Sequence, residues 1–178
     1  FNQFENPANP EIHSKTTAKE IWEQSNHIID GLVTGVGTGG TVTGCATYLK
    51  KVNPKCKIYA VEPKKSAVIS GCNPGSHSIQ GIGAGFIPKV LKKELIDEIL
   101  TIDDDEAFYF GRLLAKKEGL LSGISSGAAI AATIKIAKRK ELSGKRLVVI
   151  LPSFGERYLS TAMFDNNTSI ISREDGYL

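Results

Sequence analysis

Apolar and polar positions along this chain alternate between short runs typical of buried strands and longer stretches with helical spacing. Four apolar runs of five or six residues are predicted strands: GLVTGV (31–36), KIYAVE (57–62), EILTI (98–102) and RLVVIL (146–151). Helices are predicted over about 16–25, 41–52, 103–117, 126–138 and 157–164. Strands that alternate with helices indicate βαβ units, so we expect an α/β fold with a mostly parallel sheet.

Three segments interrupt this alternation. Residues 1–12 carry three Asn and two Pro and are predicted to be irregular. Residues 71–88 are rich in glycine and form a long predicted loop, a kind of segment that is usually functional in a compact domain. Residues 165–178 form a polar tail, which we expect to be poorly ordered.

Composition and charge narrow the classes of function. The 178 residues include 22 basic and 19 acidic side chains, a net charge of +3 that is too small and too evenly spread to indicate nucleic-acid binding. No apolar run approaches the roughly 18 residues of a membrane span. The three cysteines form no CxxC pair and the three histidines are scattered, so we expect neither a disulfide framework nor a metal site. This cysteine usage favours a reducing compartment.

The strongest local motif lies between the first predicted strand and its helix. In Gly37-Thr38-Gly39-Gly40-Thr41 the glycines let backbone N–H groups approach a ligand at a helix N-terminus, where a phosphate is favoured. The same stretch also fits a dinucleotide fingerprint, Gly35-x-Gly37-x-x-Gly40, with Glu62 at the end of the next strand as a candidate ribose ligand. The local pattern leaves a phosphate ester and a dinucleotide equally open.

Two further motifs follow predicted strands or open helices. Residues 123–127 match the GxSxG pattern, but a hydrolase needs a histidine after the serine, and His13, His27 and His77 all precede it. The plainer interpretation is a turn of small residues that caps the next helix and packs closely against a neighbour. Pro152 ends the last strand and presents Ser153 at the carboxyl edge of the sheet, where open α/β folds bind ligands.

Together these motifs resemble one family. The similarity to the cysteine synthase (O-acetylserine sulfhydrylase) family runs from about Gln3 to Phe164 and is carried by NPANPEIH (6–13), GVGTGGTVTG (35–44), IQGIGAGFIP (79–88), GISSGAAIAA (123–132) and LPSFGERYLST (151–161). The resemblance implies a three-layer pyridoxal-phosphate enzyme fold of type II. Residues 1–164 would be its C-terminal, cofactor-binding domain. The phosphate interpretation then outweighs the dinucleotide one, and Glu62 becomes an ordinary residue at a strand end.

The resemblance also implies residue roles. The 5′-phosphate of pyridoxal phosphate would be held by Gly37, Thr38, Gly39, Gly40 and Thr41, and Ser153 would hydrogen-bond the pyridine nitrogen. A serine hydroxyl does not enforce a protonated ring as a carboxylate would, which suits β-elimination. Gln3 and Gly81 would line the substrate site. The implied reaction is β-replacement, in which O-acetylserine and sulfide give cysteine and acetate. Cystathionine β-synthase and β-cyanoalanine synthase activities share the phosphate motif and stay open.

Departures from the family pattern are equally informative. The family's Schiff-base lysine lies in a Ser/Lys/Asp/Arg-type motif that this sequence lacks, so we expect no catalytic residue in the chain and no activity from it alone. A binding module without activity is the corresponding alternative. The family implies a homodimer and a cytoplasmic enzyme. Its partner serine acetyltransferase is placed in question, because Ser76 and Ser78 stand where the family usually has basic residues.

Overall fold

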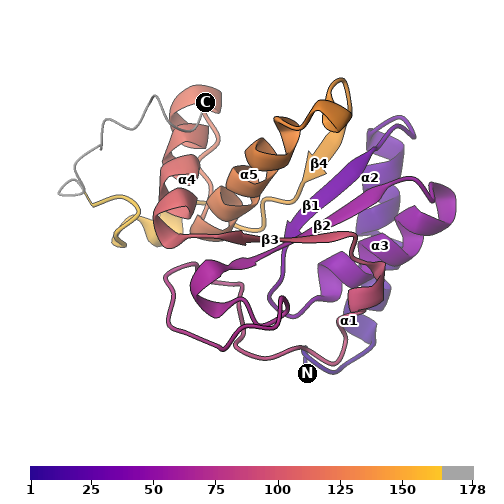
Figure 1. Ribbon diagram of the computed structural model, residues 1–178, viewed down its shortest axis with the longest axis horizontal. Coiled ribbons are helices and arrows are strands. Elements are labelled where there is room, and N and C mark those ends of the chain that lie inside the picture. Colours follow the sequence, from indigo (N-terminus) through magenta and orange to yellow (C-terminus); the bar gives the residue numbers. More distant parts are fainter. Residues whose placement is uncertain (166–178) are drawn as a thin grey trace.

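A four-stranded parallel sheet in the order β3-β2-β1-β4 forms the centre of the computed structural model, which describes residues 1–165 (Figure 1). The strands are β1 (Gly31–Gly35), β2 (Lys57–Pro63), β3 (Glu98–Ile102) and β4 (Leu147–Val149). The α-helices are α1 (Ala8–Lys15), α2 (Thr17–Gln24), α3 (Gly40–Val52), α4 (Asp104–Glu118) and α5 (Ile124–Ala137). Short 3₁₀ turns cover Lys64–Ser66, Lys93–Leu95, Lys140–Leu142 and Glu156–Tyr158. The predicted α/β class with a parallel sheet is confirmed.

Helices cover both faces of the sheet and create two cores. On one face, Leu32 and Ile58 pack with residues of α2 and α3 such as Ala18 and Leu49. On the other face, residues that alternate with these along the strands, such as Val33, pack against α4 and α5. Since successive side chains of a strand point to opposite faces, strands buried on both sides read as continuous apolar runs. Figure 1 shows the resulting three layers.

The helix pair on the second face begins as its sequence predicts. Asp103 and Glu106 form a reciprocal capping box at the start of α4, so the acidic cluster 103–106 serves a helix N-terminus. α4 packs directly on α5. At their crossing, a Cβ on Gly127 would lie 2.0 Å from the Ala107 carbonyl oxygen. The expected close packing of the GxSxG stretch is therefore confirmed, although Gly123 caps α5 without a side-chain hydrogen bond.

The prediction that residues 1–12 are irregular holds for residues 1–7 and is wrong from Ala8 onward. Helix α1 begins at Ala8, directly after the Asn6 side chain accepts a hydrogen bond from the Ala8 N–H group at 3.0 Å. Pro10 lies in the first turn of this helix, where a missing N–H group costs nothing because those groups have no partner within the helix. Packing against α3 then stabilises a segment whose local composition indicates a loop.

Two predictions near the carboxyl end of the chain also differ from the structure. Residues 157–164 do not form a helix: only the short turn Glu156–Tyr158 is present, and the chain then folds back so that Met163 is fully buried against Gly111. The strand predicted over 146–151 is reduced to β4, which pairs with β1 and lies at the edge of the sheet formed by residues 1–165. The predicted tail lies outside the described residues except for Asp165.

The connection from β2 to β3 contains no α-helix. It includes the predicted loop 71–88, which is irregular as expected and lies below the sheet in Figure 1. Within residues 1–165, no helix combines the length and the apolar character that crossing a membrane requires.

Candidate functional site

The turn between β1 and α3 has the geometry of an anion cradle. Gly39 adopts a left-handed backbone conformation (φ +83°) directly before α3 begins at Gly40. Among the described residues, the backbone N–H groups of Gly37, Thr38, Gly39 and Thr41 donate to no protein acceptor. Several open donors therefore converge at the positive end of the α3 dipole, an arrangement that favours a negatively charged group.

The long loop closes one side of this turn. A Cβ on Gly37 would lie 2.4 Å from the Gly81 carbonyl oxygen, so the two backbones touch. Gly81 is itself in a left-handed conformation (φ +92°), and a Cβ there would lie 3.8 Å from the Ser125 hydroxyl oxygen. Gly37 and Gly83 contribute to the lining of a small hollow between the turn and the loop. The loop thus brings Gly81 beside the turn and beside the start of α5.

Ser153 lies on the other side of the same sheet edge. Its backbone carbonyl accepts hydrogen bonds from the Gly123 N–H group at 2.8 Å and from the Ser126 hydroxyl at 3.4 Å. Its own hydroxyl oxygen is 3.1 Å from the hydroxyl of Tyr158, which is buried. A Cβ on Gly123 would lie 2.3 Å from the Ser153 hydroxyl oxygen, so glycine at position 123 leaves the room that this hydroxyl occupies.

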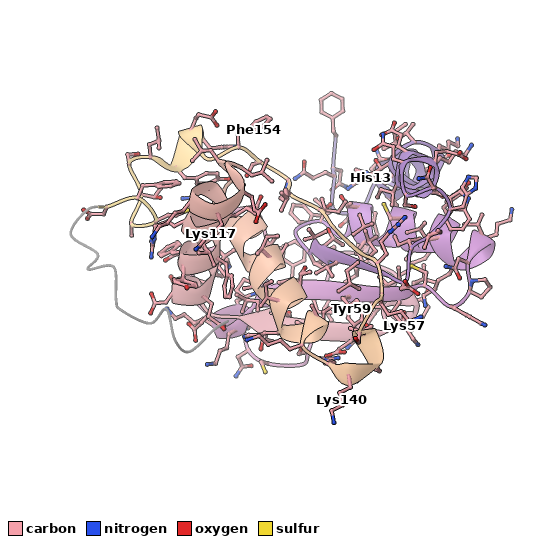
Figure 2. All side chains as sticks on the ribbon, turned by 90° about the horizontal axis from the view of Figure 1, so that it is seen from above. His13, Lys57, Tyr59, Lys117, Lys140 and Phe154 are labelled. Atoms are coloured by element: carbon pink, nitrogen blue, oxygen red, sulfur yellow. The ribbon has the colours of Figure 1, made fainter. Side chains whose placement is uncertain are left out.

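The carboxyl edge of the sheet therefore gathers most of the predicted site residues. The turn at 37–41 follows β1, and Ser153 follows its neighbour β4, so both lie where parallel strands end. Figure 2 shows His13 and Phe154 along this side of the molecule, opposite the side that carries Lys140, which precedes β4. Gln3 approaches through its main chain, whose carbonyl accepts a hydrogen bond from the Asn9 side chain at 2.8 Å; its own side chain is exposed.

Glu62 has a different role from both roles considered for it. Its carboxylate is 1% exposed and accepts hydrogen bonds from the Ile69 and Ser70 N–H groups, each at 2.9 Å, and from the Ser70 hydroxyl at 2.5 Å. These bonds point the carboxylate into the protein, so it is not available to a ribose hydroxyl. Glu62 is also not an ordinary strand-end residue, because it anchors the first part of the long loop.

The GxSxG stretch does not form a nucleophile elbow. Ser125 is only 4% exposed and lies in the first turn of α5. The histidines have other hydrogen-bond partners. His77 bridges the Ile79 N–H group and the Gly83 carbonyl, and His27 pairs with Glu23. Within residues 1–165, no histidine is hydrogen-bonded to Ser125.

Residues of α1 border the turn and were missed by sequence reasoning. His13 lies 2.9 Å from the Thr17 hydroxyl through Nδ1 and 3.4 Å from the Thr41 hydroxyl through Nε2. Asn9 reaches Thr38 at 3.0 Å. The available signals were the place of both residues in NPANPEIH (6–13), a segment that carries the family resemblance, and their spacing by four positions, which places both on one face of a helix.

The pH dependence of stability is expected to report on His13. Burial lowers the pKa of its imidazole below the ordinary value of 6.5. Below that value the unfolded chain takes up a proton that the folded chain resists, so the free energy of unfolding falls as the pH drops from the unfolded pKa through the lowered folded one. Urea unfolding at about pH 7.5 and about pH 5.5 measures this loss. A His13→Gln variant should lose less stability across this range; an equal loss would contradict the assignment.

Two other kinds of reactive site were considered among residues 1–165: a metal site and an ionised cysteine. Within residues 1–165, no group of three or more His, Cys, Asp or Glu side chains is arranged to hold a metal ion. Burial raises the pKa of Cys45 to about 12 and that of Cys56 to about 11, so neither thiol ionises near neutral pH.

Comparison with known proteins decides between a phosphate ester and a dinucleotide, the two ligands that the pattern of the turn left open. A family model described as pyridoxal-phosphate dependent enzyme matches residues 1–153. The chain belongs to this family. The family's phosphorylated cofactor agrees with the open N–H donors of the turn, whereas Glu62, the acidic residue that a dinucleotide would need, is engaged inside the protein.

Several curated relatives of this chain are cysteine synthases. It is 56% identical over 175 residues to cysteine synthase of Buchnera aphidicola (subspecies Schizaphis graminum), a match that covers 94% of this chain and 54% of that protein. It is 51% identical over 172 residues to cysteine synthase A of Escherichia coli K12, covering 92% and 53% of the two chains. The chain thus spans about half the length of the curated relatives that it matches.

Solved structures agree on the fold. The crystal structure of cysteine synthase from Entamoeba histolytica superposes with a TM-score of 0.90 at 50% identity, covering 92% of this chain and 48% of that one. The predicted resemblance to cysteine synthases and the predicted type of pyridoxal-phosphate enzyme fold are both confirmed.

The residues present fit the cofactor that the family description names. The open N–H donors of Gly37, Thr38, Gly39 and Thr41 at the N-terminus of α3 suit the phosphate of that cofactor. Across the same edge, the Tyr158 hydroxyl can donate to Ser153, which leaves the Ser153 proton for an acceptor such as a ring nitrogen. The turn thus offers donors suited to a phosphate, and Ser153 offers a donor suited to a ring nitrogen.

Proposed function

We propose that this chain is the cofactor-binding part of a cysteine synthase, which converts O-acetylserine and sulfide into cysteine and acetate. The observation that carries the proposal is the meeting of the open glycine turn and Ser153 at one sheet edge, in a chain 56% identical to a cysteine synthase. In this proposal Gly37 to Thr41 hold the 5′-phosphate, Ser153 bonds the pyridine nitrogen, and Gln3 and Gly81 border the substrate.

The chemistry divides between the cofactor and the chain. The bound cofactor supplies an electron sink for negative charge at the substrate α-carbon, which is what a β-replacement needs. The turn orients the cofactor through its phosphate, because the donors of the α3 N-terminus and the dipole hold a dianion in one place. The Ser153 hydroxyl leaves the ring nitrogen without a fixed proton, a state suited to loss of a β-substituent.

A phosphate-dependent difference in binding tests the cofactor assignment. Pyridoxamine 5′-phosphate has no aldehyde to react with surface lysines, so calorimetric titration measures non-covalent binding. We expect it to bind at least about tenfold more tightly than pyridoxamine, as one or two hydrogen bonds to a charged group would produce. A Ser153→Ala variant should weaken binding of pyridoxamine 5′-phosphate by a few fold and leave binding of inorganic phosphate unchanged. Equal affinity for the phosphorylated and unphosphorylated ligands would contradict the assignment.

The substrate pair is tested by product formation. The family's Schiff-base lysine motif has no counterpart in the 178 residues, so we expect the isolated chain to form no cysteine above background. The protein purified from its natural source is expected to form cysteine from O-acetylserine and sulfide. Turnover with another nucleophile, and none with sulfide, would exclude the proposed substrate pair.

A further inference from the structure

Helix α1 approaches the N-terminal turn of α3 closely because α3 presents two glycines to it. A Cβ on Gly40 would lie 1.9 Å from the Asn9 side-chain oxygen, and a Cβ on Gly44 would lie 2.2 Å from the Pro10 carbonyl oxygen. The two glycines are four positions apart, so they lie on one face of α3. The space that their missing side chains leave is occupied by the amide of Asn9 and by the backbone of α1.

The orientation of the Asn9 amide follows from its partners. Its Nδ2 lies 2.8 Å from the Gln3 carbonyl oxygen and 3.0 Å from the Thr38 hydroxyl oxygen. A carbonyl oxygen only accepts, so the atom facing it must be the nitrogen and not the amide oxygen. The two protons of the amide are therefore donated to Gln3 and Thr38.

The Thr38 hydroxyl consequently has one hydrogen bond left to make, as a donor. Its hydroxyl oxygen accepts from Asn9 and also from the Gly40 N–H group at 3.1 Å. These two bonds use both lone pairs of the hydroxyl oxygen, so its proton is left as a donor. Thr38 belongs to the same turn whose backbone N–H groups have no protein acceptor within the described residues.

We propose that Asn9 is a positioning residue that makes the Thr38 hydroxyl a dedicated donor to the cofactor phosphate. By occupying the acceptor side of Thr38, the Asn9 amide directs the hydroxyl proton toward the open side of the turn. Through its second bond, the same amide holds the Gln3 backbone next to the phosphate site. This inference rests on the proposed function, since it assigns the phosphate as the acceptor.

The test reverses the hydrogen-bonding character of position 9 without changing its size. In Asn9→Asp the new carboxylate accepts the Thr38 proton instead of donating to the oxygen, faces the Gln3 carbonyl, and brings a negative charge next to the phosphate. We expect the affinity for pyridoxamine 5′-phosphate and for inorganic phosphate to fall at least about tenfold, the loss of one charge-assisted hydrogen bond. The affinity for pyridoxamine should be unchanged within about twofold, because it lacks the phosphate that senses the change.

The matched control is Asn6→Asp, which makes the same charge change in the same segment. The Asn6 side chain is exposed, donates to the Phe1 carbonyl at 3.2 Å and accepts from the Ala8 N–H group, and within residues 1–165 it makes no hydrogen bond to the turn. We expect its phosphate affinity to remain within about twofold of the unmodified chain. Circular dichroism at the titration temperature checks that both variants are folded.

A second pair of variants separates positioning from a general structural effect. Thr38→Val removes the hydroxyl, so Asn9→Asp added to it should weaken phosphate binding by much less than tenfold. Thr38→Ser keeps the hydroxyl, so in that background Asn9→Asp should retain its full effect. An equal effect of Asn9→Asp in the Val and Ser backgrounds, or equal losses in Asn9→Asp and Asn6→Asp, would overturn the inference and leave the proposed function standing. Absence of phosphate binding by the unmodified chain would overturn both.

Discussion

Replacement of Gly127 by alanine is expected to lower the free energy of unfolding by about 3 kcal/mol, or to prevent folding. The added Cβ would lie 2.0 Å from the Ala107 carbonyl oxygen and 2.8 Å from the Gly111 nitrogen, both of them backbone atoms of α4. Relief requires α4 and α5 to move apart along their whole contact. The gain of about 1 kcal/mol in helix propensity is too small to offset that.

Gly111→Ala is the matched control, because it makes the same substitution at the same helix crossing. There the new Cβ would meet the end of the Met163 side chain at 2.2 Å, and the nearest backbone atom is 3.7 Å away. A flexible methionine can move aside, so we expect a loss of at most about 1 kcal/mol. Urea unfolding followed by circular dichroism measures both variants. Equal losses of stability in the two variants would show that contact with the α4 backbone is not the reason that alanine is unfavourable at position 127.

Glu62→Gln is expected to lower the free energy of unfolding by about 2 to 4 kcal/mol. The native carboxylate accepts three hydrogen bonds, from two backbone N–H groups and the Ser70 hydroxyl. A glutamine amide offers one oxygen and turns an NH₂ group toward at least one of these donors. In a side chain that is 1% exposed, that donor has no water to replace its lost partner.

The exposed Glu94 provides the control, since Glu94→Gln makes the same isosteric change at a carboxylate in contact with solvent. We expect its effect to stay within about 0.5 kcal/mol. Amide hydrogen exchange gives a second readout: in Glu62→Gln, the protection of the Ile69 and Ser70 N–H groups should fall more than that of the strand residues. Unchanged protection there would contradict the role of Glu62 as the anchor of the loop.

Both experiments concern contacts that only the folded chain creates. The fold and the candidate site likewise have some features that the sequence predicts and others that only packing creates. The pattern of apolar runs predicts the strands and the helices between them, because a buried parallel strand and an amphipathic helix each leave a period in the chain. The turn at 37–41 is equally visible, since its glycines and threonines are adjacent in sequence. The cap of α4 is visible for the same reason, with Asp103 and Glu106 three positions apart.

Helix α1 shows where local patterns fail. Its asparagines and prolines are typical of a loop, and its stability comes from the contact with α3, whose two glycines let it approach. The predicted helix over 157–164 fails for the converse reason. Its helical pattern is overruled by the burial of Tyr158 and Met163, which requires the chain to fold back over α4 and α5.

The sequence by itself therefore determined the class of fold, the glycine-rich turn at 37–41 that we propose to bind phosphate, and the family resemblance, each of which rests on local patterns in the chain. The tertiary structure alone decided that Asn9 borders the turn and how Ser153 is held against the start of α5. Asn9 reaches Thr38 across 29 positions, and the carbonyl of Ser153, in the segment after β4, accepts a hydrogen bond from the Gly123 N–H group. It also directed the Glu62 carboxylate inward rather than toward a ligand. Such hydrogen bonds depend on how helices and strands pack, and packing leaves no period or spacing in the sequence.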